Sequence, residues 1–384
     1  MDFDEVVDRR GTNTVKWDSS AEEKMLPMWI ADMDFRSPAS IQAALANRAR
    51  HGIFGYTRIP DAFFQAIGEW WERSHGMAVD RDLIVPLAGV LPAITAILRS
   101  CMLPGQKVIV QPPVYNRFFE AIQNSGSKVV ENNLKYLEEE YTFDFEDLEK
   151  KATDSETKVL LLCNPHNPVG RSWNKVELGR LSKICSENGL IVISDEVHSD
   201  LVYDAQEHIP FASIAREYEV ACFTLGSPGK SFNLSGLQVA YLFCPDKQMK
   251  LDVENRLEGA NELNVFAVEG LIAAYSHENF QWLSRLKAYL YDNYLFLKHF
   301  FNSRLPEVRI ARLEATYLVW MDCRQLNKTS HEIQSHLLQA EKLWLVSGEL
   351  YGGSGEGFLR INIACPRKDL EEGLLRFERG YRSL

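Results

Sequence analysis

The feature that most constrains the fold is a regular alternation of short apolar runs and helical patterns between about residues 50 and 278. Apolar runs without polar alternation are typical of strands that are buried on both faces of a parallel sheet. Their alternation with helices predicts an α/β fold in which a mostly parallel sheet lies between helices. Seven strands are expected, at 83–86, 107–111, 128–131, 158–163, 190–194, 221–225 and 239–244.

The pattern changes after this region. Residues 280–301 carry apolar side chains at spacings of three and four, which predicts a long helix that leaves the sheet. Residues 315–322 and 357–364 follow as two strand candidates, so a smaller α+β unit is expected near the C-terminus. The glycine-rich segment 351–357 has no strand before it and no helix after it, which favours a flexible loop over a dinucleotide site. The predicted division is a large domain over 49–285 and a small domain formed by 1–48 and 286–384.

Composition excludes several kinds of protein. A hydrophobic content of 46% in 384 residues is enough for a large core. The net charge of −11 and the absence of a Lys/Arg cluster argue against a nucleic acid as the main partner. No apolar run approaches the roughly 20 residues of a membrane helix, and the first residues do not resemble a secretory signal. We therefore expect a cytoplasmic protein that does not bind membranes.

Cysteine and histidine usage gives no sign of disulfides or a metal site. The seven cysteines are scattered and contain no Cys-x-x-Cys pair, so buried free thiols are expected. The nine histidines show no spacing typical of metal ligands, and we predict no metal site.

Two residues indicate chemistry. Lys230 stands among small residues in the stretch 225–233, and Asp195 ends the apolar run 189–194. A lysine in such surroundings can form an imine with an aldehyde, and a carboxylate at the carboxyl end of a buried strand can keep a pyridine nitrogen protonated. Together they predict a pyridoxal phosphate site. A surface lysine and a helix-capping aspartate would explain the pair equally well.

Further residues could complete this site. Gly89, Val90 and Leu91 begin a predicted helix, whose exposed N–H groups suit a phosphate. Ser227 could bind the same phosphate or serve only in a turn. Asn167 begins the second of two Asn-Pro steps after a strand, where its amide could donate to the cofactor's phenolic oxygen.

An aromatic ring and a buried cation extend the prediction. Tyr115 also follows a strand and could stack on the pyridine ring, or could belong to the core. Arg360 lies between large apolar residues in a predicted strand, so it needs an anion, which could be the carboxylate of a substrate or an internal salt-bridge partner.

These motifs together resemble the aspartate-aminotransferase fold of pyridoxal phosphate enzymes (fold type I, class I/II), and most closely its MalY/PatB-type branch of cysteine and cystathionine C–S β-lyases. The resemblance spans nearly the whole chain, and several motifs in order are more specific than one. They are the segments 28–35, 54–58, 163–170, 194–198, 230–237 and 358–364.

The resemblance implies a role for each of these residues. Lys230 is then the Schiff-base lysine and the base at the substrate Cα, Asp195 pairs with the pyridinium, and Arg360 binds the substrate α-carboxylate. Tyr56 would come from the second subunit of a homodimer, so that the active site is shared. Asn167, Tyr115 and His198 would lie around the ring, Gly89, Val90, Leu91 and Ser227 at the phosphate, and Trp29 and Arg58 in the distal pocket.

The implied activity is α,β-elimination from L-cystathionine or L-cysteine-type amino acids, which gives a thiol or hydrogen sulfide, pyruvate and ammonia. Gln238 occupies the position where aminotransferases of this fold carry an arginine, which agrees with the lyase branch. Gly229 and Ala88 replace a hydroxyl residue and a proline that are common in the fold. An aminotransferase, or a regulatory protein that retains the cofactor, are the alternatives.

Overall fold

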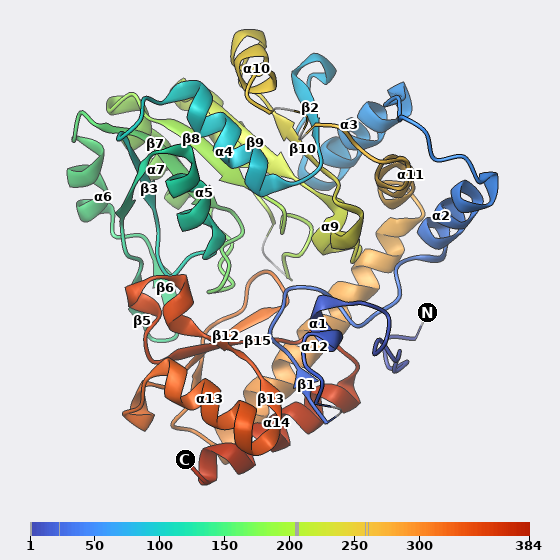
Figure 1. Cartoon of the computed structure of the whole chain (residues 1–384). Helices are drawn as coiled ribbons and strands as arrows, with labels where there is room; N and C mark the ends of the chain where they lie inside the picture. The colour runs from blue at the N-terminus through green and yellow to red at the C-terminus, as the bar shows by residue number, and fades with distance from the viewer. Residues whose placement is uncertain (1, 23, 204–206, 258, 260) are drawn as a thin grey trace.

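The computed structural model describes every residue of the chain except 1, 23, 204–206, 258 and 260. A seven-stranded sheet lies between helices in the upper part of the view, with the strand order β2-β10-β9-β8-β7-β3-β4 (Figure 1). β10 is antiparallel to both of its neighbours, and the other six strands run in one direction. The strands are β2 Ile84–Leu87, β3 Lys107–Val110, β4 Lys128–Glu131, β7 Thr157–Cys163, β8 Ile191–Asp195, β9 Cys222–Gly226 and β10 Ala240–Phe243. All seven predicted strands are confirmed.

Helices cover both faces of this sheet because its strands bury both sets of alternating side chains. Val108 of β3 packs with apolar residues of α4 and α5, whereas its neighbour Ile109 packs with those of α6, α7 and α8. The predicted sheet between helices is therefore confirmed. These helices are α4 Val90–Cys101, α5 Arg117–Ser125, α6 Phe145–Ala152, α7 Lys175–Glu187 and α8 Phe211–Ala215.

Further helices and a small sheet complete the first 275 residues. A two-stranded sheet pairs β5 with β6, and α2 packs against α11. The bounds are α1 Val15–Asp18, α2 Ala39–His51, α3 Asp61–His75, β5 Lys135–Leu137, β6 Glu140–Thr142, α9 Pro228–Ser231, α10 Lys247–Glu254 and α11 Val265–Ala274.

A second, smaller sheet lies toward the C-terminus, as expected. Its four strands have the order β11-β12-β15-β14, with antiparallel pairing throughout. The N-terminal segment joins this part, because β1 pairs with β13. The elements are β1 Leu26–Pro27, α12 Asn279–Arg304, β11 Arg309–Ile310, β12 Leu318–Asp322, α13 Ser330–Glu341, β13 Leu343–Trp344, β14 Val346–Ser347, β15 Phe358–Asn362 and α14 Arg367–Arg382.

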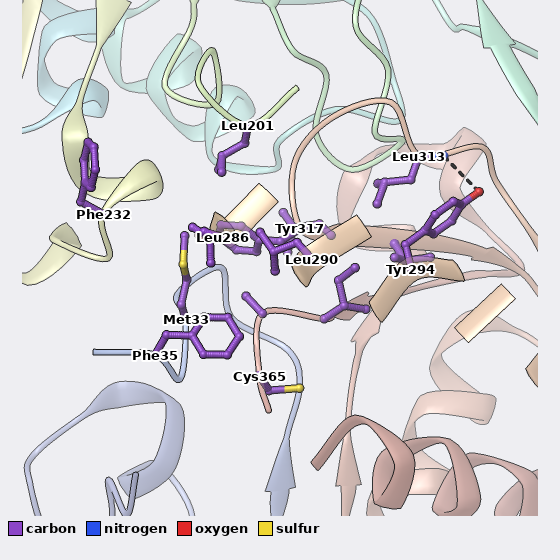
Figure 2. Close-up of a cluster of buried hydrophobic side chains, with 14 of the residues drawn as sticks. Met33, Phe35, Leu201, Phe232, Leu286, Leu290, Tyr294, Leu313, Tyr317 and Cys365 are labelled. Carbon is purple, nitrogen blue, oxygen red and sulfur yellow. Dashed lines mark hydrogen bonds between the residues drawn. The ribbon is translucent and has the colours of Figure 1, made fainter. Parts of the chain in front are cut away.

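The long helix α12 connects the two parts and carries their shared core. Figure 2 shows Leu286 and Leu290 of α12 among side chains from the N-terminal segment, the turn after β8 and the C-terminal part. Met33, Leu201 and Tyr317 represent these three segments. Segments that are far apart in the sequence therefore meet beneath the carboxyl edge of the large sheet.

The predicted domain boundaries fall inside helices. Residues 48 and 49 lie within α2, and residues 285 and 286 lie within α12. We retain the division into 49–285 and 1–48 with 286–384 as a proposal. Within the described ranges, no helix combines the length and the apolar character needed to cross a membrane.

The glycine-rich segment 351–357 leads into β15, as expected for a loop, and its backbone is closely packed. It contains the end of one 3₁₀ helix, Gly348–Tyr351, and all of another, Gly353–Gly355. A Cβ atom on Gly348 would lie 2.2 Å from the carbonyl oxygen of Gly355, so only glycine permits this contact. The sequence pattern shows the glycines but not the contact that requires them.

Candidate active site

The predicted site residues gather where the parallel strands of the large sheet end. Each of β2, β3, β7, β8 and β9 ends in one of them or is followed by one, and these strands run in the same direction. Their carboxyl ends therefore meet at one edge, which is where open α/β sheets bind ligands. The residues are Gly89 after β2, Tyr115 after β3, Asn167 after β7, Asp195 at the end of β8 and Lys230 after β9.

Lys230 is partly buried in the four-residue helix α9, which follows β9 directly. Its amine donates a hydrogen bond to the carbonyl oxygen of Ala31 at 2.7 Å, and it forms no salt bridge with any described residue. Burial lowers the pKa of Lys230 to about 8, although Asp32 and Asp195 favour its charged form. A substantial fraction of this amine is therefore neutral near neutral pH, and only a neutral amine can attack an aldehyde.

Asp195 is 4% exposed and also lacks an ionic partner among the described residues. Its Oδ1 accepts a hydrogen bond from the Val197 N–H at 3.3 Å. Burial raises the pKa of Asp195 to about 7, and the positive charge of Lys230 compensates only in part. A cation beside this carboxylate would be strongly favoured, which is the property expected of the partner of a pyridinium.

Tyr115 lies close to this carboxylate. Burial and then the charge of Asp195 raise the pKa of the Tyr115 hydroxyl. Its ring packs edge-on against Phe118 at a centroid distance of 5.6 Å. The position agrees with a ring that could stack on a ligand, and the stacking itself stays a prediction.

Arg360 enters the site from β15 of the smaller sheet and is 5% exposed. Its Nη1 donates to Asn167 Oδ1 at 3.1 Å, and its Nη2 donates to the carbonyl oxygen of Trp29 at 2.7 Å. The Nε group is buried without a hydrogen-bond partner. Arg360 makes no salt bridge within the described part of the chain, so the alternative of an internal ion pair is not met. A buried guanidinium in this state is suited to bind a carboxylate.

His198 is buried in the turn that follows β8, and its Nδ1 has no hydrogen-bond partner. Burial, together with the positive charges of Lys230 and Arg360, lowers its pKa well below the ordinary value. The imidazole is therefore neutral. Its ring meets Tyr317 edge-on at 6.0 Å, and the unpartnered nitrogen is available to a ligand.

The start of α4 lies at the same edge. Gly89 precedes this twelve-residue helix, Val90 and Leu91 form its first turn, and no side chain caps it. Backbone N–H groups at such a start suit a phosphate.

Ser227 caps α9 in the structure. Its hydroxyl donates to the Val239 carbonyl oxygen at 2.7 Å and accepts from the Gly229 N–H at 3.0 Å. A contact with phosphate stays a prediction. A Cβ atom on Gly229 would lie 3.0 Å from Ser227 Oγ, so a larger residue here would require that hydroxyl to shift slightly. Gln238 is exposed with a φ of 54°.

The remaining predicted residues differ in burial. Trp29 is partly buried and stacks on Trp344 at 4.7 Å, and its Nε1 has no hydrogen-bond partner. Tyr56 is fully exposed in the single chain, within a segment of irregular structure that also exposes Ile53 and Phe54. Arg58 is exposed in the same segment. Tyr56 therefore does not join the residues around Lys230 within one chain.

Three contacts of the site were not predicted. The Ala31 carbonyl accepts from both Lys230 and Tyr317, the latter at 3.1 Å. The ring of Tyr351 lies 5.1 Å from the Arg360 guanidinium. Ala31 belongs to the motif 28–35, which signals the segment, whereas no sequence pattern indicates that Tyr317 and Tyr351 reach the site.

Comparison with known proteins gives a consistent result. The model of the family described as aminotransferase class I and II matches residues 24–377. The chain is 38% identical to cystathionine beta-lyase PatB of Bacillus subtilis, over 98% of this chain and 99% of that protein. It is 35% identical to protein MalY of Escherichia coli, over 97% of each. The crystal structure of cystalysin from Treponema denticola, which contains a pyridoxal 5'-phosphate cofactor, matches with a TM-score of 0.95 and 29% identity, over 100% of this chain and 99% of that one.

Proposed function

The chain belongs to the aminotransferase class I and II family, and from this premise we propose that it is a pyridoxal-phosphate-dependent carbon–sulfur β-lyase. It cleaves amino acids of the L-cystathionine and L-cysteine type by α,β-elimination to a thiol or hydrogen sulfide, pyruvate and ammonia. The observation that carries the proposal is the set of three buried or partly buried ionisable side chains that meet at this site, Lys230, Asp195 and Arg360. None of them has an ionic partner among the described residues. Asp195 matches the positive charge of the ring nitrogen, Arg360 matches the negative charge of the substrate carboxylate, and Lys230 provides the amine that links to the aldehyde.

The residues fit the cofactor. Asp195 would hold the ring nitrogen, because its unpaired carboxylate favours a cation. Asn167 presents Oδ1 to Arg360, which leaves its amide nitrogen to donate to the ring oxygen. The unpartnered Nδ1 of His198 supports a contact near the same oxygen, and Tyr115 would stack on the ring. The N–H groups of Gly89, Val90 and Leu91, with Ser227, would hold the phosphate.

When bound, pyridoxal phosphate supplies an aldehyde for an amine and a ring that accepts the electron pair from the substrate Cα. Lys230 supplies that amine in the resting enzyme, and later takes the Cα proton at Nζ. With a pKa of about 8, roughly a tenth of it is neutral at pH 7, compared with about one part in three thousand at the ordinary value. Asp195 keeps a proton at the ring nitrogen throughout. Arg360 binds the substrate carboxylate, and this fixes the Cα hydrogen relative to Nζ.

The decisive experiment measures pyruvate. Purified protein loaded with pyridoxal phosphate is mixed with L-cystathionine, and pyruvate is followed with lactate dehydrogenase and NADH. A second reaction supplies an amino acid and a 2-oxo acid to detect transamination. Pyruvate release without amino transfer is the expected result, whereas amino transfer alone would replace the lyase with an aminotransferase. The Lys230→Ala variant is the control, and it should lack both the absorbance of the lysine–cofactor link and the activity.

We further propose that two copies of the chain form a homodimer with shared active sites. Ile53, Phe54 and Tyr56 are exposed together, at 67%, 57% and 107%, and exposed apolar clusters of this kind mark contact surfaces. Tyr56 would then reach the phosphate and the substrate of the second subunit, and Trp29 and Arg58 would line the distal pocket. A small-molecule amino-acid substrate is expected for this family.

We also propose a cytoplasmic location. All seven cysteines are free thiols, and six of them are buried. Unpaired thiols are typical of a reducing compartment.

A further inference from the structure

A second buried carboxylate lies next to the proposed catalytic lysine. Asp200 is 6% exposed and stands in the turn that follows β8. Its Oδ2 accepts a hydrogen bond from Ser231 Oγ at 2.6 Å, and Ser231 is the neighbour of Lys230 in the chain. Its Oδ1 accepts from Trp70 Nε1 at 2.9 Å and lies 3.1 Å from His75 Nε2. One carboxylate therefore contacts α9 and α3 at once.

The helix that carries Lys230 needs such support. α9 has only four residues, and a helix of this length is not stable by itself. Ser227 holds its start through Val239, and Ser231 holds its end through Asp200. Between these two anchors Lys230 has a single hydrogen bond, to Ala31. The position of its amine thus depends on how firmly both ends of α9 are held.

The Asp200 carboxylate is built to remain charged. Burial alone would raise its pKa, but the hydrogen bonds from His75, Ser231 and Trp70 outweigh burial and hold the pKa below the ordinary value. An ionised acceptor forms stronger hydrogen bonds than a neutral one. The bond to Ser231 is therefore strong and oriented.

We propose that Asp200 is a positioning residue, which fixes Lys230 at the cofactor through Ser231 and keeps the amine on the protein side of the site, facing Asp195. The inference rests on the proposed function, because it assumes that Lys230 is the lysine that binds the cofactor. Asp200 acts through Ser231 and does not itself contact substrate or cofactor. It links the turn after the strand that ends in Asp195 to the helix that carries Lys230, and so sets the spacing between the two.

The consequence is measurable in the full-length, cofactor-free chain. The charged groups that face Lys230 are Asp32, Arg360 and Asp195, and none of them contacts Ser231. If the C-terminal end of α9 is released, the amine gains access to solvent and its pKa moves up toward that of a free lysine. The rate at which the chain forms its covalent link with added pyridoxal phosphate follows the neutral amine, so the pH midpoint of that rate reports the pKa of Lys230.

Two variants and one control make the test. Ser231→Ala removes the hydrogen bond and leaves Asp200 with Trp70 and His75. Asp200→Asn retains an acceptor for Ser231 but removes the charge. Ser235→Ala is the matched control, because Ser235 is exposed in the same loop and its hydroxyl makes only a long contact, 3.4 Å, with the Gly229 carbonyl.

We expect the pH midpoint to rise by about one unit in Ser231→Ala and by a smaller amount in Asp200→Asn, with no change in Ser235→Ala. Affinity for pyridoxal phosphate should fall roughly three- to tenfold in Ser231→Ala. Loss of thermal stability with an unchanged midpoint would overturn the inference, because it would mean that Asp200 serves only the core. If the wild-type chain forms no covalent link, the proposed function itself fails, which is a different outcome from equal midpoints in wild type and Ser231→Ala.

Discussion

Replacement of Arg360 by lysine tests how the substrate is held. The guanidinium has five N–H donors, and the structure uses one for Asn167 and one for Trp29, which leaves Nε and two others for a carboxylate. Arg360→Lys keeps the charge but loses the second parallel hydrogen bond and both supports. A hydrogen bond to a charged group contributes about 1.5–3 kcal/mol, so the loss should be about 2–3 kcal/mol. This corresponds to a fall of roughly 30- to 150-fold in kcat/KM, mostly through KM.

The assay compares two substrates. An S-alkyl-L-cysteine carries the α-carboxylate, and its methyl ester has no negative charge there. Pyruvate or its ester is measured for wild type and variant with each, and only the acid should lose rate in the variant. An equal loss for acid and ester, or a loss of less than about threefold for the acid, would refute a direct contact between Arg360 and the carboxylate.

The control is Arg324→Lys. Arg324 also lies over aromatic rings, 4.9 Å from the ring centroid of Phe358, but it is exposed and already paired with Asp322 at 2.8 Å. Arg324 therefore makes the same kind of contact with aromatic rings as Arg360, but its guanidinium is already paired with a carboxylate. We expect kcat/KM of Arg324→Lys to remain within about twofold of wild type.

Three further results are expected. In Asp195→Asn the cofactor-free chain should be more stable than wild type at pH 8 and equal to it near pH 4. The reason is that the folded-state pKa of Asp195 is about 7, so the wild type loses stability as the pH rises from about 4 to 7, by an amount on the order of 2–4 kcal/mol. Thermal unfolding of both proteins across this pH range measures the loss. A difference in stability between variant and wild type that stays constant with pH would contradict the prediction. The Lys230→Ala and Tyr56→Ala variants should each be inactive alone. Mixed in equal amounts and allowed to exchange subunits, they should regain about a quarter of wild-type activity, because half of the dimers are then mixed and each mixed dimer has one intact site out of two. If no activity returns, Tyr56 does not belong to a shared site. Trp29→Phe keeps the stack on Trp344 but removes an N–H that has no partner, and KM for L-cystathionine should rise roughly two- to tenfold with kcat retained; an unchanged KM would mean that the indole N–H does not face the substrate.

The sequence predicts the sheet well because its strands are short, mostly apolar runs that alternate with helices. The seven strands form one sheet, but the hydrophobic periodicity does not reveal that β10 runs antiparallel to its neighbours. The segment 351–357 shows the opposite case. Its glycines look like a loop, but two backbones approach there so closely that no Cβ fits, and such a contact depends on residues that are brought together only by the fold.

The candidate site follows the same rule. Asn167, Asp195 and Lys230 are predictable because each lies at or directly after the end of a strand, and parallel strands bring their carboxyl ends together. Tyr317 and Tyr351 come from the smaller part of the chain, 87 and 121 residues after Lys230, and no local pattern marks them. The burial that lowers the pKa of Lys230 and raises that of Asp195 also needs the packed structure, since it depends on the segments that cover them.

The fold therefore holds charged side chains in the site although their burial without an ionic partner is unfavourable. Asp195 and Arg360 lie in or at the end of sheet strands, where apolar residues or a complete ion pair would be more stable. Both charges lack an ionic partner among the described residues, whereas the nearby carboxylate of Asp200 is fully satisfied by three donors. Asp195 and Asp200 thus differ in function although they lie within six residues of each other in the sequence. The hydrogen-bonded carboxylate of Asp200 fixes the local geometry, whereas the carboxylate of Asp195 lacks an ionic partner that a positively charged ligand can provide.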